Sequence, residues 1–341
     1  VERYHTQILK VWERLDISWD LYTKTTTANH YEAVQAFFLT LLEKGSLYKE
    51  TMRSPYCPTD HRFLQDRYIL GTCPHCGFPR ARGDQCEQCG TLLDPEQLID
   101  PYCRICLSKT STIEFRPTEH YFWDLPKLQE PLEEWAGTAM THWRPHVVGV
   151  VNGWLREGLK PRAFTRDIDW GVPVPVPGFE NKRIYVWYDA VMGYLTATME
   201  WAKNQGTPDA WRDWWVTTEA QPQPSKSYYF IGKDNITFHA IIWPALLLGH
   251  GGLVLPYDVP ANEFMQMGGL KASSSEGNVV WTPDALDRYG PDALRYYLAA
   301  IMPEQRDTNF SYEDLVRRNN DELVAACLLY TSDAADDLTR V

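Results

Sequence analysis

The fold of this chain is decided by residues 228–249, which read YYFIGKDNITFHAIIWPALLLG. Residues 228–231 form a short apolar run that predicts a buried strand, and Gly232 and Asp234 are turn residues that end it. The apolar residues at 236–249 predict a helix. A strand, a turn and a helix in this order indicate a βαβ unit of a parallel sheet. Ligands bind at the carboxyl ends of such strands, so we expect residues 233–239 in a pocket wall.

The same alternation occurs upstream. Residues 184–187 predict a second short strand and residues 190–202 a helix, which places 187–194 at the same edge of the sheet. Residues 29–44 predict a helix capped by Asn29, with its apolar side chains on one face at Val34, Phe37, Phe38, Leu41 and Leu42. Residues 128–159 also read as helical, whereas the alternating prolines at 172–178 predict an extended connection. The fold class is therefore α/β.

Seven of the eight cysteines lie between Cys57 and Cys106. Two C-x-x-C pairs separated by nine residues predict a tetrahedral zinc site, whose four ligands are Cys73, Cys76, Cys86 and Cys89. Disulfides or redox thiols are the alternative, but no secretory signal is visible and disulfides are rare in the cytosol. We therefore prefer structural zinc.

The remaining cysteines of this segment suggest a second site. Cys103 and Cys106 form a third pair, and Cys57 supplies a third thiolate. In the run Cys57-Pro-Thr-Asp60-His61 a fourth thiolate is absent, so Asp60 or His61 has to complete the set. We select His61, because imidazole suits zinc. The alternative is that these thiols hold no metal and pack as small apolar side chains.

Composition excludes several classes of protein. The chain has 341 residues, of which 44% are hydrophobic and 23% charged, and its formal charge is −12. No apolar run reaches the roughly 18 residues that span a bilayer. The polar start indicates no signal peptide, so we expect a cytoplasmic protein without a membrane partner. Net acidity disfavours a generic DNA binder, although a local basic patch can still hold a nucleic acid.

A lysine loop is the remaining chemical motif. Residues 267–278 read MGGLKASSSEGN. Glycines let backbone N–H groups approach an anion, serines add hydroxyl donors, and Lys271 adds positive charge. A flexible surface loop has the same composition, so the loop alone is weak support for phosphate chemistry. Neither a P-loop nor a dinucleotide-binding glycine fingerprint is present in the sequence.

Taken together, these segments resemble a known family. Residues 230–234 (FIGKD) with His239 and Trp243-Pro244, followed by 271–275 (KASSS), are similar to the second half of class I aminoacyl-tRNA synthetases. Residues 185–194 (YVWYDAVMGY) resemble the methionine-pocket segment of the methionyl-tRNA synthetase family. The cysteine insert, 295–298 (RYYL) and 307–310 (DTNF) match the same family in order. The resemblance spans residues 1–326.

The resemblance implies a Rossmann-like class I catalytic domain with a zinc-knuckle connective insert and the start of an all-helical domain. The family's H-I-G-H signature and first strand have no counterpart here, and most of the anticodon domain is absent. We expect six segments: 1–52, remnant of the N-terminal half of the nucleotide-binding domain; 53–162, connective peptide; 163–255, C-terminal half of the catalytic domain; 256–310, lysine-loop region; 311–326, start of the anticodon-binding domain; 327–341, a non-native tail.

The resemblance also implies the activity. The family activates L-methionine with ATP and magnesium to methionyl-adenylate and transfers methionine to tRNA(Met). The resemblance assigns the methionine pocket to Trp187, Ala190, Tyr194 and His239. It assigns ATP binding to Gly232, Asp234, Lys271, Ser273, Ser274 and Ser275, with Lys271 catalytic. We expect Tyr194 or His239 to donate a hydrogen bond to the thioether, Asp189 to be structural, and Arg166 and Asp167 to support the site.

One departure and two alternatives remain. Ser274 stands where the family has its second signature lysine, which together with the missing segments predicts that this chain alone does not catalyse the reaction. Another class I synthetase for an aliphatic amino acid is the nearer alternative, and a large editing insert would mark it. A non-catalytic zinc-knuckle module that binds nucleic acid is the other, and it would need neither the aromatic pocket nor the lysine loop.

Overall fold

The main hydrophobic core forms where three helices pack together: α2 (Ala28–Glu43), α5 (Val186–Asn204) and α7 (Trp243–His250). The computed structural model describes residues 1–65, 68–83, 86, 88–89, 93–106, 113–272 and 277–326. The helix expected at 29–44 is confirmed as α2, which buries Val34, Phe37, Phe38 and Leu41. Asn29 does not cap it, because Thr27 is the N-cap residue and the Asn29 amide donates to the Thr196 carbonyl of α5 instead.

A parallel strand pair carries the predicted pocket edge. β10 (Ile231–Gly232) pairs with β11 (Ala261–Asn262), and the Tyr229 and Ile231 N–H groups donate to the carbonyls of Asp258 and Pro260. Parallel pairing is therefore confirmed, in a sheet of two strands. The strand expected at 184–187 is shorter and different: β9 (Arg183–Ile184) pairs antiparallel with β8 (Thr165–Arg166). Tyr185 is the N-cap of α5, so Trp187 lies in the first turn of a helix.

The helix expected at 236–249 contains an irregular turn. Residues Phe238–Ile242 are π-helical and lead directly into α7, with the Trp243 N–H donating to the Phe238 carbonyl five residues back. Pro244 explains the widened turn. It has no N–H for the carbonyl four residues earlier, and its ring collides with that carbonyl in a regular α-helix.

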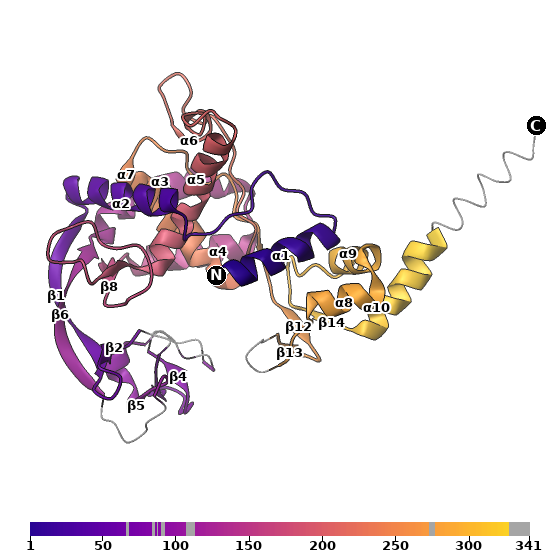
Figure 1. Ribbon diagram of the computed structural model, residues 1–341, viewed down its shortest axis with the longest axis horizontal. Helices are drawn as coiled ribbons and strands as arrows, with labels where there is room; N and C mark the ends of the chain where they lie inside the picture. The colour runs from indigo at the N-terminus through magenta and orange to yellow at the C-terminus, as the bar shows by residue number, and fades with distance from the viewer. Residues whose placement is uncertain are drawn as a thin grey trace, which may run out of the picture.

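A long antiparallel hairpin extends from the body and was not predicted. β1 (Leu47–Cys57) pairs with β6 (Glu114–Trp123) from Leu47 opposite Trp123 to Tyr56 opposite Glu114. It is flanked by β2 (Arg62–Phe63) and β7 (Arg162–Ala163) in the order β2-β1-β6-β7. Figure 1 shows the curved hairpin at the left edge of the molecule. Most β1 side chains are partly or fully exposed, so the strand lacks the alternation of apolar residues that predicts strands.

The cysteine segment forms a knob at the far end of this hairpin, with a core of its own (Figure 1). It contains an antiparallel sheet in the order β4-β3-β5, with β3 at Ile69–Thr72, β4 at Ala81–Arg82 and β5 at Ile99–Cys103. The region 128–159 is two helices rather than one, α3 (Gln129–Ala139) and α4 (Pro145–Glu157), with Pro145 in the first turn of the second. A short helix, α6 (Arg212–Trp215), follows α5.

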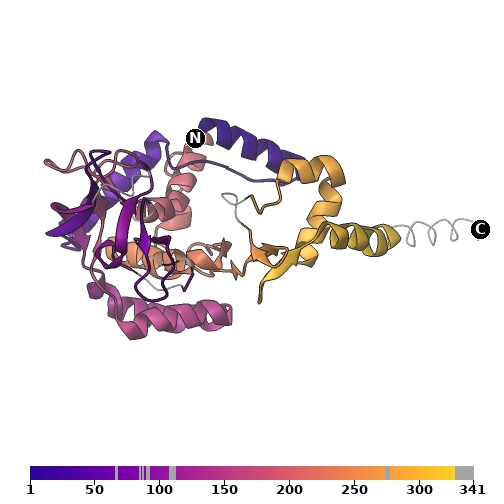
Figure 2. The ribbon, with the colours of Figure 1, turned by 90° about the horizontal axis from the view of Figure 1, so that it is seen from below.

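The C-terminal unit has the third hydrophobic core. Its elements are β12 (Met265–Met267), β13 (Leu270–Lys271), α8 (Thr282–Tyr289), α9 (Pro291–Ala300), β14 (Thr308–Phe310), α10 (Tyr312–Arg318) and a π-helical turn at Asn319–Val324. The N-terminal helix α1 (Glu2–Arg14) packs beside α8, with Arg14 Nη2 2.5 Å from Asp287 Oδ1 (Figure 2). The Arg295 guanidinium also donates to the carbonyls of Leu15 and Asp16.

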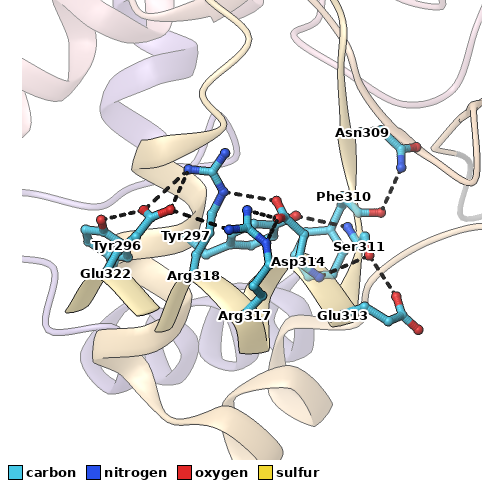
Figure 3. A network of polar contacts seen from close by, with 10 residues as sticks. All are labelled: Tyr296, Tyr297, Asn309, Phe310, Ser311, Glu313, Asp314, Arg317, Arg318 and Glu322. Atoms are coloured by element: carbon cyan, nitrogen blue, oxygen red, sulfur yellow. Dashed lines mark hydrogen bonds and ion pairs between the residues drawn. The ribbon is translucent and has the colours of Figure 1, made fainter. Parts of the chain in front are cut away.

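The first turns of α10 are held by a polar network (Figure 3). The Ser311 hydroxyl caps the helix by accepting from the Asp314 N–H at 3.3 Å. The Asp314 carboxylate accepts from both Arg317 and Arg318, and Arg318 also reaches Glu322. α10 continues into the π-helical turn, so the chain is helical from Tyr312 to Val324. In the described part of the chain, no helix is both long enough and apolar enough to cross a membrane.

Close packing around Gly71 leaves no room for a side chain at this position of the knob. A Cβ atom at this position would lie 2.9 Å from Leu98 Cβ and 3.0 Å from the Ile99 carbonyl oxygen. We expect Gly71→Ala to destabilise the knob by about 1–3 kcal/mol, because β3 and β5 would have to separate. Amide hydrogen exchange in β3 and β5 measures this directly. Gly149→Ala in α4, with nothing within 4 Å of the added atom, is the control and should slow exchange in α4. Unchanged exchange of the knob in Gly71→Ala would contradict the prediction.

Candidate functional site

An aromatic cluster forms between α5 and the π-helical turn. The rings of Trp187 and Phe238 stack with centroids 4.7 Å apart and planes 15° apart. Two turns further along α5, the Tyr194 hydroxyl lies 2.7 Å from His239 Nε2. Three of the residues assigned to the methionine pocket are therefore brought together from two segments about 45 positions apart in the sequence. Phe238 was not predicted, although it directly precedes His239.

The side chains of Tyr194 and His239 form hydrogen bonds with other groups of the protein. His239 Nδ1 lies 2.9 Å from the Asn235 carbonyl, which can only accept, so Nδ1 carries the proton. The other ring nitrogen then accepts from the Tyr194 hydroxyl. Burial lowers the pKa of His239, which keeps the ring neutral near pH 7. In this arrangement the Tyr194 hydroxyl and the His239 Nδ1 proton both donate to protein groups. A hydrogen bond from either side chain to a thioether stays a prediction.

The buried side chain of Tyr229 packs against the aromatic cluster. Tyr229 is 3% exposed, and its ring meets that of Tyr194 edge to face at 4.8 Å. The Trp243 indole N–H donates to the Tyr229 hydroxyl at 2.9 Å, and burial raises the pKa of Tyr229 to about 12. Tyr229 was treated only as part of a strand, because its spacing is that of an ordinary core residue. The contact of Tyr229 with both Tyr194 and Trp243 is visible only in three dimensions.

A cavity of about 280 Å³ lies on the adjoining face of α5. It is lined by Thr23, Lys24, Thr25, Ala190, Gly193, Tyr194, Thr196 and Ala197. Ala190 and Tyr194 thus belong to the wall of a hollow, as expected of pocket residues. The opposite wall comes from the segment between α1 and α2, which the sequence analysis did not connect with the site. Hydroxyl groups predominate among its polar side chains.

The turn after β10 separates two charged side chains. Asp234 is exposed and accepts a hydrogen bond from the Asn235 amide at 3.1 Å. Lys233 instead forms ion pairs with Glu263 at 2.5 Å and Asp307 at 2.8 Å. A side chain on Gly232 would come within 2.9 Å of the Asp234 carboxylate, so this position needs a glycine if Asp234 is to keep its place. Asp234 is therefore open to a ligand, whereas Lys233 links the body to the C-terminal unit.

The first cysteine cluster has the geometry of a metal site. The Sγ atoms of Cys76 and Cys86 are 3.6 Å apart, those of Cys73 and Cys89 are 3.9 Å apart, and all four lie within 4.8 Å of one another. Tetrahedral zinc with bonds of about 2.3 Å needs sulfur atoms about 3.8 Å apart. A disulfide needs about 2.05 Å, so these thiols are not oxidised pairs. The residues fit a four-sulfur metal ion.

A second cluster corrects the sequence analysis. Its members are Cys57, Asp60, Cys103 and Cys106. His61, the residue selected as fourth ligand, is not a member: its backbone has φ of 50° and its side chain is exposed. Burial and the nearby Asp60 carboxylate raise the pKa of the Cys103 thiol to about 12. Without a cation this thiol keeps its proton at neutral pH.

The comparisons with known proteins agree with the resemblance. The family model described as "tRNA synthetases class I (M)" matches residues 1–332. This chain belongs to the class I tRNA synthetases. A methionine–tRNA ligase of Roseiflexus castenholzii is 55% identical over 95% of this chain and 55% of its own length. One from Dehalococcoides mccartyi is 53% identical over 95% of this chain and 57% of its own length.

A solved structure shows the same fold. Mycobacterium tuberculosis methionyl-tRNA synthetase, in complex with methionyl-adenylate, is 26% identical, with a TM-score of 0.66 over 93% of this chain and 54% of that chain. The predicted class I synthetase fold is thereby confirmed. The chain spans about half the length of the curated relatives it matches. The six expected segment boundaries stay predictions.

The lysine loop of this synthetase begins with a tight hairpin. β12 and β13 are joined by Gly268 and Gly269, whose φ values of 59° and 75° require glycine. The Gly269 N–H donates to the Asn309 side chain at 2.9 Å, which fastens the hairpin to β14. Ser273, Ser274, Ser275 and the side chain of Lys271 lie outside the described residues, as does the tail at 327–341. Their assigned roles stay predictions.

The two residues expected to support the site lie just before α5. The Arg166 guanidinium stacks 4.0 Å from the ring centroid of Tyr185, the N-cap of α5. Burial alone raises the pKa of Asp167, but hydrogen bonds from His120 and Lys182 outweigh it and hold the pKa at about 2. Asp167 therefore remains ionised and ties β6 to the loop before β9. This arrangement fixes the start of the helix that carries Trp187.

Asp189 predicts a pH-dependent stability. Burial raises the pKa of Asp189 from 3.8 to about 7. The folded state therefore holds the Asp189 proton more tightly than the unfolded chain does. The free energy of unfolding keeps this contribution below the unfolded-state pKa and loses it as the pH rises towards 7. We expect Asp189→Asn to leave the free energy of unfolding nearly unchanged at pH 4 and to raise it by about 2–4 kcal/mol at pH 8.

Denaturant unfolding at the two pH values measures this difference. Asp209→Asn, at a carboxylate 87% exposed, is the control and should show no pH-dependent difference from the original chain. An Asp189→Asn effect of equal size at pH 4 and pH 8 would contradict the assignment, because loss of packing or of a neutral hydrogen bond does not depend on pH.

Proposed function

We propose that this chain is part of a methionine–tRNA ligase. The whole protein then uses ATP to convert L-methionine into methionyl-adenylate and transfers methionine to tRNA(Met), in the cytoplasm. The observation that carries the proposal is the meeting of Trp187, Tyr194 and His239 in one aromatic cluster. A thioether is apolar and polarizable, and aromatic rings contact sulfur favourably. An aliphatic side chain is also buried favourably against rings but lacks the sulfur–aromatic contact, which makes the other class I synthetases the weaker alternative.

The reaction needs positioning and charge stabilisation more than covalent chemistry by the protein. In the proposal, the cluster and Ala190 hold the methionine side chain at the border of the cavity on α5. Gly232 lets the ligand approach the strand end, where the exposed Asp234 accepts hydrogen bonds from the adenosine ribose. Lys271 with Ser273, Ser274 and Ser275 faces the phosphates and lowers the cost of the charge that develops as pyrophosphate leaves.

Two metals complete the proposal. Magnesium accompanies ATP and neutralises its phosphates. Zinc is bound by Cys73, Cys76, Cys86 and Cys89, whose sulfur spacing fits it. This zinc has a structural role: the knob core is small, and the ion replaces the apolar burial that so short a segment lacks. A binding module that holds nucleic acid without catalysis would have no use for the aromatic cluster, which disfavours that alternative.

The full-length protein that contains this chain tests the proposal by ATP–pyrophosphate exchange. We expect exchange to depend on methionine and to be far weaker with leucine, isoleucine or valine. Lys271→Ala should reduce the rate by about 10²–10³-fold, as loss of one stabilising group in a transition state commonly does. Lys160→Ala, at an exposed lysine outside the site, is the control and should leave the rate unchanged. Exchange driven equally by an aliphatic amino acid would refute the substrate, and full activity of Lys271→Ala would refute the role of the loop.

A further inference from the structure

We infer that Lys233 is a positioning residue for the proposed reaction: it fixes the β12–β13 hairpin, and with it the start of the lysine loop, against the strand end that carries Asp234. The Lys233 ammonium lies 2.5 Å from Glu263 Oε2 and 2.8 Å from Asp307 Oδ1. Lys233 directly follows β10, whereas both carboxylates belong to the chain around the hairpin. The inference rests on the proposed function and adds a residue that acts on the site through the strands of the lysine-loop region.

The two carboxylates lie where two strands of the sheet β13-β12-β14 begin (Figure 1). Glu263 lies between β11 and β12, and its N–H donates to the Pro303 carbonyl at 2.7 Å. Asp307 directly precedes β14, which pairs in parallel with β12 from Met265 opposite Thr308. Because parallel strands begin at the same edge of a sheet, one ammonium group contacts the chain at the start of both.

Asp307 also binds the strand that leads into the hairpin. Its carboxylate accepts from the Phe264 N–H at 2.9 Å and from the Gln266 side-chain amide at 3.3 Å. The Thr308 N–H donates to the Phe264 carbonyl at 3.1 Å, and the Lys233 ammonium lies 4.3 Å from the centroid of the Phe264 ring. A shift of Lys233 therefore has to move the residues directly before β12.

The Lys233 ammonium is charged and is engaged by these partners. Burial lowers the pKa of Lys233, but hydrogen bonds to Asp307 and Glu263 outweigh burial and raise the pKa above its ordinary value. The same ammonium, followed by the Phe264 N–H, lowers the pKa of Asp307. All three charged side chains are partly buried, so salt screens them less than a surface pair. A lysine neutralised by two carboxylates is poorly suited to binding phosphates itself, which favours the positioning role.

A second contact crosses the same junction and does not involve Lys233. Arg144, the N-cap residue of α4, donates to Asn262 Oδ1 at 2.8 Å and to Glu304 Oε1 at 2.9 Å. Glu304 lies between α9 and β14, outside the strands of the hairpin sheet. This contact keeps the C-terminal unit on the body when Lys233 is replaced. We therefore expect loss of Lys233 to loosen the start of β12 and β14 and to leave the unit attached.

ATP–pyrophosphate exchange by the full-length protein tests the inference. Lys233→Met should lower kcat/KM for ATP by about 10–10²-fold and change the dissociation constant of methionine by less than about twofold, because a misplaced hairpin costs orientation at the phosphates and not at the aromatic cluster. Lys203→Met, at an exposed lysine in the last turn of α5, is the matched control and should change neither value. Equal losses of methionine affinity and of ATP use in Lys233→Met would overturn the inference.

Asp307→Asn separates positioning from direct contact with phosphate. This variant keeps the Lys233 ammonium and removes the charge of one partner. If Lys233 bound phosphate itself, the rate would stay the same or rise; positioning predicts a fall in kcat/KM for ATP. The double variant Lys233→Met with Asp307→Asn should then lose no more than Lys233→Met alone, since both changes remove one interaction. Full activity of Asp307→Asn, or additive losses in the double variant, would contradict the inference.

Amide hydrogen exchange of the full-length protein without substrates gives a readout that does not depend on activity. Lys233→Met should speed amide exchange in β12 and β14 and leave α5 unchanged, whereas Lys203→Met should leave both strands unchanged. Unchanged amide exchange in β12 and β14 of Lys233→Met would overturn the inference even if the original protein activates methionine. Faster amide exchange in these strands, in a protein whose pyrophosphate exchange does not depend on methionine, would instead contradict the proposed function.

Discussion

The site depends on one backbone constraint, the missing N–H of Pro244. The helix before it cannot close as a regular α-helix and widens into a π-helical turn at Phe238–Ile242. Within that turn, the adjacent residues Phe238 and His239 reach Trp187 and Tyr194, which lie two turns apart on α5. Adjacent side chains could not meet partners about 10 Å apart along a helix unless they diverged. The widened turn therefore determines the shape of the aromatic cluster.

Each of the three hydrophobic cores positions a different chemical group. The main core fixes α5 and the π-helical turn, the knob core surrounds the two cysteine clusters, and the C-terminal core carries the β12–β13 hairpin that leads into the lysine loop. A charged side chain links the regions of the first and third cores: Lys233 pairs with Glu263 and Asp307. The β12–β13 hairpin and the aromatic cluster thus lie in regions with separate hydrophobic cores, which the ion pairs of Lys233 connect.

Much of this could be predicted from the sequence, and the failures have physical causes. The first four-cysteine cluster could be predicted because C-x-x-C spacing is a local property. The approach of Trp187, Tyr194 and His239 to one another could be predicted because several separate motifs resemble one family in order. The hairpin of β1 and β6 could not, because exposed strands lack alternation. His61 was preferred over Asp60 on ligand chemistry, yet backbone direction decides which side chain enters the cluster. Phe238 and Tyr229 carry no signal that separates them from core residues.

The central claim is that the cluster between α5 and the π-helical turn receives the side chain of methionine. A crystal structure of the full-length protein with bound L-methionine tests it most directly. The account predicts the thioether sulfur against the rings of Trp187, Tyr194 and His239, with the amino acid reaching towards Asp234 at the strand end. The account would be contradicted if methionine bound elsewhere while the rings of Trp187 and Phe238 remained stacked on each other.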